Sequence, residues 1–286
     1  MPIRVFVVRQ AIFGNVDVTS GASPIDLPST SPALAIIATE GITVSGTVHV
    51  SQGNLSSGTC TGVDGQSSYD EEPGQVMTAG GGGGGAATAG GNGGMMGPMG
   101  SPPGGTPSGM DSLEPLRGGC AGGGTYSVED PTYGYPGGPG GGAIQLSSRT
   151  QIEIDGTINV NGVDGGGGGD QSTNFVLGGG GGGGVLLEAP TVAIGSVGAL
   201  SAAGGNGFGC MPSGAYCGGG GNGATGSVAA GAGGDSDFDH SHPTMTSGAG
   251  GGGLGRIRIN TPTASYASTA TSVLNGHLTT GTLRTR

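Results

Sequence analysis

The stretch Ile152-Glu153-Ile154-Asp155-Gly156-Thr157-Ile158-Asn159-Val160 decides the fold that the sequence predicts. Aliphatic and polar side chains alternate on both sides of a Gly-Thr pair, and strict alternation indicates a β-strand with one buried face. β-Branched side chains favour strands on either side of the pair. Because glycine tolerates a bend without a Cβ, the stretch predicts two short strands joined by a corner.

The same pattern recurs elsewhere in the chain. A close copy spans Ile42 to Val50, and a looser copy spans Val192 to Leu200. Each copy follows a second short aliphatic run, and Arg256 to Asn260 has the pattern of the first strand of a fourth unit. A single unit cannot bury its aliphatic face alone. We therefore expect the units to stack as rungs of a parallel β-helix or β-solenoid.

Glycine accounts for 73 of the 286 residues. The longest runs lie at 80–85, 165–169, 178–184, 218–221 and 250–253. Several of these runs directly precede an aliphatic strand, which favours ordered segments, although flexible linkers are the alternative. Polyglycine can form an extended threefold helix that rises about 3.1 Å per residue. We predict that such polyglycine II-like segments pack against the rungs.

The predicted fold class is all-β with essentially no α-helix. Residues 1–286 are expected to form a single elongated domain. Within it, 61–139 is predicted as an irregular excursion rich in Gly, Pro and Met, and 206–247 as a second loop-rich insertion.

Composition and charge exclude several classes of protein. The chain is 33% hydrophobic and 9% charged, unlike charge-rich disordered chains, and no strict Gly-X-Y period supports collagen. The net charge is −11 and every basic residue is arginine, so nucleic-acid binding is not expected. No apolar stretch is long enough for a transmembrane helix. The start, Met1-Pro2-Ile3-Arg4, lacks the apolar run of a signal peptide, so we expect a mature form or an export route that the sequence does not display.

Four cysteines suggest two disulfides in an oxidising, extracellular setting. The natural pairing is Cys60–Cys120 and Cys210–Cys217, although four cysteines allow three connectivities, and free thiols are the alternative.

One dense polar cluster is a candidate metal site for Ca²⁺ or a transition metal. The candidate ligands are Asp235, Asp237, Asp239, His240 and His242. The alternative is a solvated loop. Asp64 and Asp164 occupy matching Gly-Val-Asp-Gly turns, where an Asx hydrogen bond is the expected role. No organic cofactor is predicted.

Catalytic signals are absent from the sequence. The arginines are dispersed, and no Ser-His-Asp set is recognisable. Only Arg256 and Arg258 share a strand face, with Asn260 beside them, and salt links to acidic residues are the expected role of these arginines. We expect the chain not to be an enzyme.

Two segments carry a resemblance to a known family. A glycine run followed by Val185-Leu186-Leu187-Glu188-Ala189-Pro190-Thr191-Val192, and another followed by Leu254-Gly255-Arg256-Ile257-Arg258-Ile259-Asn260-Thr261, resemble glycine-rich exoproteins of myxobacteria and related bacteria. The resemblance also covers Ala33 to Val50, which looks like the entry rung, and Thr280 to Leu283, but not 61–139. It implies a secreted or surface location and nothing catalytic. The glycine runs are also similar to those of polyglycine-containing phage tail adhesins and a springtail antifreeze protein, an analogy of architecture only.

Three functional hypotheses follow. The first is an extracellular structural protein of a cell surface, matrix or fibre that self-associates through exposed strand edges. The second is an adhesin or receptor-binding tip, bacterial or phage, that recognises a glycan or surface protein through loops 61–139 and 206–247. Ice binding is weaker, because Thr43, Thr47 and Thr157 do not build a regular array.

Overall fold

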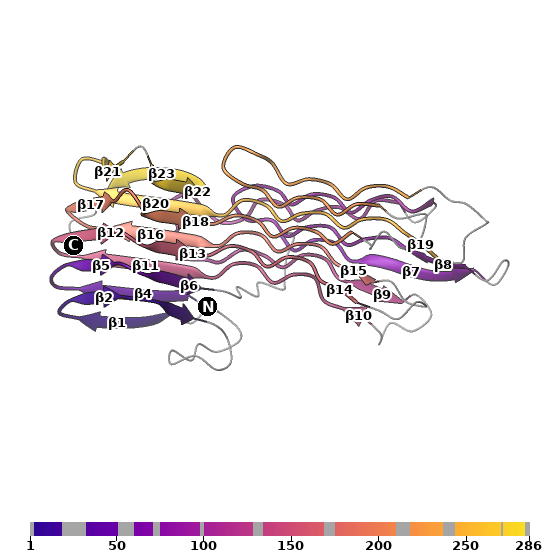
Figure 1. Ribbon diagram of the computed structural model, residues 1–286, viewed down its shortest axis with the longest axis horizontal. Coiled ribbons are helices and arrows are strands. Elements are labelled where there is room, and N and C mark those ends of the chain that lie inside the picture. Colours follow the sequence, from indigo (N-terminus) through magenta and orange to yellow (C-terminus); the bar gives the residue numbers. More distant parts are fainter. Residues whose placement is uncertain are drawn as a thin grey trace.

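The computed structural model describes residues 3–18, 33–50, 60–70, 75–97, 100–127, 134–168, 175–209, 218–236, 244–269 and 271–283. These residues form an all-β structure without an α-helix, as the sequence predicts. Figure 1 shows an elongated molecule with a stack of strands at one end, a bundle of extended segments in the middle and a small sheet at the other end. We call the stack the solenoid and the middle part the glycine bundle.

The solenoid consists of three parallel sheets. The first sheet contains, in spatial order, β1 (Arg4–Val8), β4 (Ala33–Ala38), β11 (Ala143–Ser148), β16 (Gly184–Glu188), β20 (Arg256–Thr261) and β23 (His277–Thr282). The second contains β2 (Ala11–Phe13), β5 (Ile42–Val44), β12 (Gln151–Ile154), β17 (Thr191–Ile194) and β21 (Ala267–Ser268). The third contains β3 (Val16–Val18), β6 (Thr47–Val50), β13 (Thr157–Asn159), β18 (Ala199–Ser201) and β22 (Val273–Asn275).

Each coil of the solenoid supplies one strand to each sheet, so successive coils are β1–β3, β4–β6, β11–β13, β16–β18 and β20–β22, and β23 follows. The register confirms the predicted stacking, since Ile144 lies beside Leu34 on one side and Val185 on the other. One detail of the prediction is wrong. Ala33 to Val50 is not the entry rung, because the coil from Arg4 to Val18 precedes it in every sheet.

The inward side chains of all coils form one continuous aliphatic core. Ile144, Ile154 and Ile158 in the third coil are fully buried. Glycine is needed at the corners because the coils approach closely there. A Cβ on Gly156 would lie less than 3.0 Å from Gly46 of the coil beside it, and neither glycine has a positive φ. The sequence therefore predicts the corners correctly, but close stacking rather than backbone freedom explains their glycines.

Shortening Ile154 to valine tests this core. We expect Ile154→Val to lower the free energy of unfolding by about 0.5–1.5 kcal/mol, because the side chain is fully buried and leaves a small cavity. Urea denaturation measures the change. Val197→Ala is the control, since Val197 is 72% exposed and its loss should change stability by less than about 0.5 kcal/mol. Equal losses would contradict the assignment of the core.

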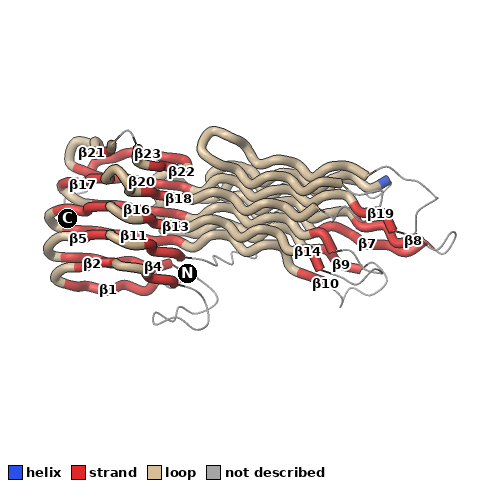
Figure 2. The backbone as a smooth tube through the Cα atoms, in the orientation of Figure 1, coloured by secondary structure: helices blue, strands red, loops and turns tan. Residues whose placement is uncertain are grey.

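The glycine bundle is made of extended segments that run along the molecule between the solenoid and the far sheet (Figure 2). Its main segments are 60–65, 79–86, 88–95, 101–108, 118–125, 135–142, 160–166, 176–184, 202–209, 218–225, 228–236 and 246–255. These segments are ordered and hydrogen-bonded to one another through their backbones.

The run at 178–184 shows how the segments are joined. From Gly178 to Gly183 the N–H groups donate in an order that repeats every third residue, to segments 118–125, 246–255 and 160–166 in turn, and Gly184 then donates to Gly142. From Gly178 to Gly181 the carbonyls accept from three further segments: 135–142, 79–86 and 202–209. A strand in a sheet bonds to neighbours on two sides only. This run therefore has more neighbours than a sheet strand, and its period of three matches the three residues per turn of an extended polyproline II-type helix.

The neighbours of this run lie in both directions. Gly179 and Gly182 donate to Gly250 and Gly253, so segments 176–184 and 246–255 run parallel. By contrast, Gly178 and Gly181 donate to Gly123 and Cys120. The acceptor numbers fall as the donor numbers rise, so segments 176–184 and 118–125 are antiparallel. The bundle therefore accepts segments of either direction.

The sheet at the far end, which we call the end sheet, contains β10 (Gly134–Tyr135), β9 (Thr125–Ser127), β7 (Gly65–Asp70), β8 (Gln75–Thr78) and β19 (Thr244–Thr246) in that order. A short antiparallel pair, β14 (Gly167–Gly168) and β15 (Phe175–Val176), lies near it in Figure 1. Met77, Met96 and Met245 form a separate small core there. Much of 61–139, which the sequence marks as an irregular excursion, thus consists of bundle segments and end-sheet strands.

A disulfide joins Cys60 to Cys120, as predicted, with a Cα–Cα distance of 5.8 Å. Both cysteines lie in bundle segments on either side of Gly85. Gly85 donates its N–H to the Cys60 carbonyl, and its own carbonyl accepts from the Cys120 N–H. The predicted partners Cys210 and Cys217 lie outside the described residues.

Candidate functional sites on the solenoid

The predicted metal site is the first candidate to place. Of its residues only Asp235 is described, and Asp237, Asp239, His240 and His242 lie outside the described part of the chain. Asp235 accepts a hydrogen bond of 2.7 Å from the Met95 N–H, so it ties two bundle segments together. Among the residues that the structure describes, no three His, Cys, Asp or Glu side chains gather as metal ligands.

Asp64 and Asp164 have the same role as Asp235. Asp64 Oδ1 accepts from the Gly124 N–H at 2.6 Å, and Asp164 Oδ1 accepts from the Asn206 N–H at 2.6 Å. Both carboxylates therefore bind the backbone of a neighbouring segment rather than close an Asx turn of their own. They satisfy donors at places where the glycine lattice supplies no carbonyl.

A strap of residues 108–117 covers part of the outer face of the first sheet. Leu113 and Leu116 pack on Ala33, Ala143 and Leu186 of that sheet. These contacts explain why Leu186, which faces outward from the first sheet, is an apolar residue. The strap thus shields an apolar part of the outer face.

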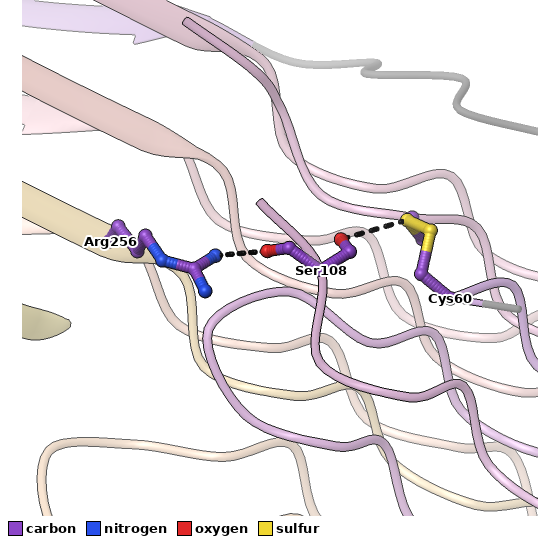
Figure 3. The surroundings of a disulfide bond; sticks show 4 residues. Cys60, Ser108 and Arg256 are labelled. Carbon is purple, nitrogen blue, oxygen red and sulfur yellow. Dashed lines mark hydrogen bonds between the residues drawn. A yellow bond between two sulfur atoms is a disulfide. The ribbon is translucent and has the colours of Figure 1, made fainter. Parts of the chain in front are cut away.

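Arg256 fastens the strap to the solenoid. Its Nε lies 3.3 Å from Asp111 Oδ1, and its Nη1 donates to the Ser108 carbonyl. The Ser108 hydroxyl lies 3.8 Å from Cys120 Sγ, so the strap also reaches the disulfide (Figure 3). The salt link expected for Arg256 is therefore present.

Arg258 behaves differently from Arg256. Its Nε–H donates to Asn260 Oδ1 at 2.9 Å, and it forms no ion pair with any residue that the structure describes. Asn260 in turn donates from Nδ2 to Glu188 Oε1 at 3.1 Å. Among the described residues, the salt link expected for Arg258 is thus replaced by a hydrogen bond to the neutral amide of Asn260.

The other oxygen of Glu188 is also occupied. Glu188 Oε2 accepts from Gln145 Nε2 at 2.8 Å and from Ser147 Oγ at 3.0 Å. A chain of hydrogen bonds therefore crosses β11, β16 and β20 on the outer face of the first sheet. We call Gln145, Ser147, Glu188, Arg258 and Asn260 the polar network.

The first coil forms an open end of the solenoid. β1, β2 and β3 each stand at the end of their sheet, so each has one edge without a partner strand among the described residues. Val5, Val7 and Ile12 are 54%, 71% and 70% exposed. Phe6 is also exposed at the end of the core, so this end presents apolar side chains together with unpaired backbone groups.

The opposite end of the solenoid has a different chemistry. Its first-sheet edge is β23, which reads His-Leu-Thr-Thr-Gly-Thr. Hydroxyl groups also hold the turns beside it, since Thr261 Oγ1 donates to the Ser265 carbonyl and Ser272 Oγ to the Thr269 carbonyl. Val273 of β22 is 54% exposed at this end, whereas the first coil exposes Val5, Phe6, Val7 and Ile12, so among the described residues the larger apolar surface lies at the first coil.

No known protein-family model matches the chain, and no curated protein or solved structure is significantly similar to it. None of the described segments is a helix with the length and apolarity to cross a membrane.

Proposed function

We propose that this chain is an extracellular, non-enzymatic structural protein of a cell surface, matrix or fibre, and that it self-associates through its first coil. The observation that carries the proposal is the open apolar end formed by β1, β2 and β3. In solenoid proteins the terminal repeats usually carry a polar outer face, which keeps them soluble. An unpaired and apolar strand edge instead promotes pairing with another chain.

The second copy of the chain is the partner that suits this end. The first coil of a second copy offers what these edges lack, a row of backbone donors and acceptors, together with an apolar face of the same width. The buried disulfide and the backbone bonds that continue from the solenoid into the bundle support a stiff spacer between the open end and the end sheet. A disulfide is typical of an oxidising compartment, which supports the extracellular location.

Charging the first coil tests the proposal. We expect the protein to form concentration-dependent oligomers, and the double variant Val7→Lys with Ile12→Lys to stay monomeric, because lysines on an edge strand block edge-to-edge pairing. Sedimentation velocity over a wide concentration range measures the assembly state. Val197→Lys is the matched control, since Val197 is as exposed but lies at a corner of the fourth coil. A parent protein that remains monomeric at high concentration would overturn the proposal.

An adhesin is the second candidate, and an exposed aromatic at the far end favours it. Tyr135 is 49% exposed and packs against Phe175, with ring centroids 4.2 Å apart and ring planes tilted by 43°. Aromatic side chains on rigid sheets suit recognition of glycans or proteins. Binding to a glycan array or to whole cells that is lost in Tyr135→Ala, and kept in the first-coil variant, would support this function over self-assembly.

A further inference from the structure

We infer that Arg258 forms a binding site for an oxyanion group of a ligand, a carboxylate or a sulfate, on the outer face of the first sheet. Its guanidinium donates through Nε to Asn260. Within the described ranges, Nη1 and Nη2 have no hydrogen-bond or ion-pair partner. They are the planar fork that binds two oxygens of a carboxylate or sulfate at once.

The polar network holds this fork in one orientation. Asn260 is only 8% exposed, and its side-chain amide is fixed at both ends by Arg258 and Glu188. Glu188 is fixed by Gln145 and Ser147. A pre-oriented arginine loses less conformational freedom on binding than a free surface arginine, so it binds an anion more strongly.

Gly281 supplies the room for the guanidinium. A Cβ at Gly281 would lie less than 3.0 Å from Arg258 Nη2, so the guanidinium occupies the place of a side chain on β23. The neighbouring outward position, Thr279, carries a side chain that donates to the Asp111 carbonyl of the strap. The absence of a side chain at Gly281 therefore leaves the space that the Arg258 guanidinium fills.

Glu188 forms no direct ion pair with Arg258. Both carboxylate oxygens of Glu188 accept hydrogen bonds from neutral donors, and no oxygen of Glu188 contacts the guanidinium. Because the whole chain carries a net charge of −11, it repels polyanions of high charge density at a distance. We therefore expect Arg258 to bind ligands that carry single, well-separated oxyanion groups.

An NMR titration of the full chain tests the site. The probes are sodium acetate, sodium glucuronate and sodium sulfate, each at constant ionic strength with chloride as the reference. We expect each oxyanion to shift the Arg258 Nε–Hε resonance saturably, and the Arg149 resonance to stay unchanged, since Arg149 lies on an exposed turn outside the network. If glucuronate binds more tightly than acetate, the site recognises the sugar ring as well as the carboxylate. If the two bind equally, the site recognises the carboxylate alone. Both results support the site.

Two variants make the proposal falsifiable. Arg258→Lys keeps the charge but removes the fork, and Gly281→Ala keeps the arginine but displaces it. We expect either change to weaken oxyanion binding by about tenfold or more. Arg149→Lys is the matched control and should bind as the parent does. Similar responses of Arg258 and Arg149, or unchanged binding in Gly281→Ala with a native circular dichroism spectrum, would overturn the inference.

Discussion

Replacing Gly180 by alanine is expected to lower the free energy of unfolding by more than about 3 kcal/mol, or to prevent folding. Gly180 lies in the run 178–184, which has neighbours on every side. A Cβ there would lie less than 3.0 Å from the Pro139 carbonyl oxygen and from the Gly138 carbonyl oxygen. These obstacles are backbone atoms, held by their own hydrogen bonds, so they cannot move aside cheaply. Urea denaturation followed by circular dichroism measures the loss.

Gly219→Ala is the matched control for this prediction. Gly219 belongs to another glycine run, 218–221, but a Cβ there would meet nothing within 4 Å. Because alanine restricts the unfolded chain more than glycine does, this variant should be unchanged or more stable by up to about 1 kcal/mol. The two substitutions are chemically identical, so effects of the same size would show that the packing of the runs is not the cause.

Removing the disulfide is expected to cost about 4 kcal/mol of stability. The bond joins residues 60 apart in sequence, and the chain-entropy model gives this value for a loop of that length. Because glycine gives the unfolded chain unusual freedom, the constraint has more entropy to remove here than in an ordinary sequence. The double variant Cys60→Ala with Cys120→Ala is compared with the parent by urea denaturation, with and without a reducing agent.

Amide exchange locates the effect of the disulfide. The backbone groups of Gly85 bond to both Cys60 and Cys120, so the run 80–85 should lose protection in the double variant before the solenoid core does. Ser108→Ala, which removes only the hydroxyl beside the sulfur, should keep that protection. A reducing agent should lower the stability of the parent to that of the double variant. It should leave the stability of the double variant unchanged. An unchanged parent would contradict the structural role of the bond.

The solenoid could be predicted from the sequence because its signal is carried by side chains. Strict alternation in 152–160 fixes which residues face inward, and a shift of one residue would turn the aliphatic face to solvent. The first coil does not match this pattern, because its corner is Gly14-Asn15 rather than Gly-Thr. There Asn15 Oδ1 accepts from the Thr47 N–H of the next coil, so the side chain replaces a backbone bond at the corner.

The partners of the glycine runs could not be predicted for the opposite reason. Without side chains, a run such as 250–253 has no pattern that specifies which neighbours it joins or in which direction. The polar network cannot be recognised as a unit from the sequence either. Arg258 and Asn260 are visible on one strand, but Glu188 and Gln145 join them only through the pairing of β16 with β11 and β20.

The hydrogen bonds of the glycine runs, which reach different neighbours every third residue, also determine how the molecule resists tension. The segments lie along the long axis, and their hydrogen bonds point sideways to neighbours in several directions. Tension applied between the two ends would therefore load many bonds in shear at the same moment, whereas a hairpin pulled open at its end loses its bonds one by one. Since the strands of the solenoid continue directly into the bundle, as Gly184 at the start of β16 does, the load passes from one layer to the other through the backbone itself.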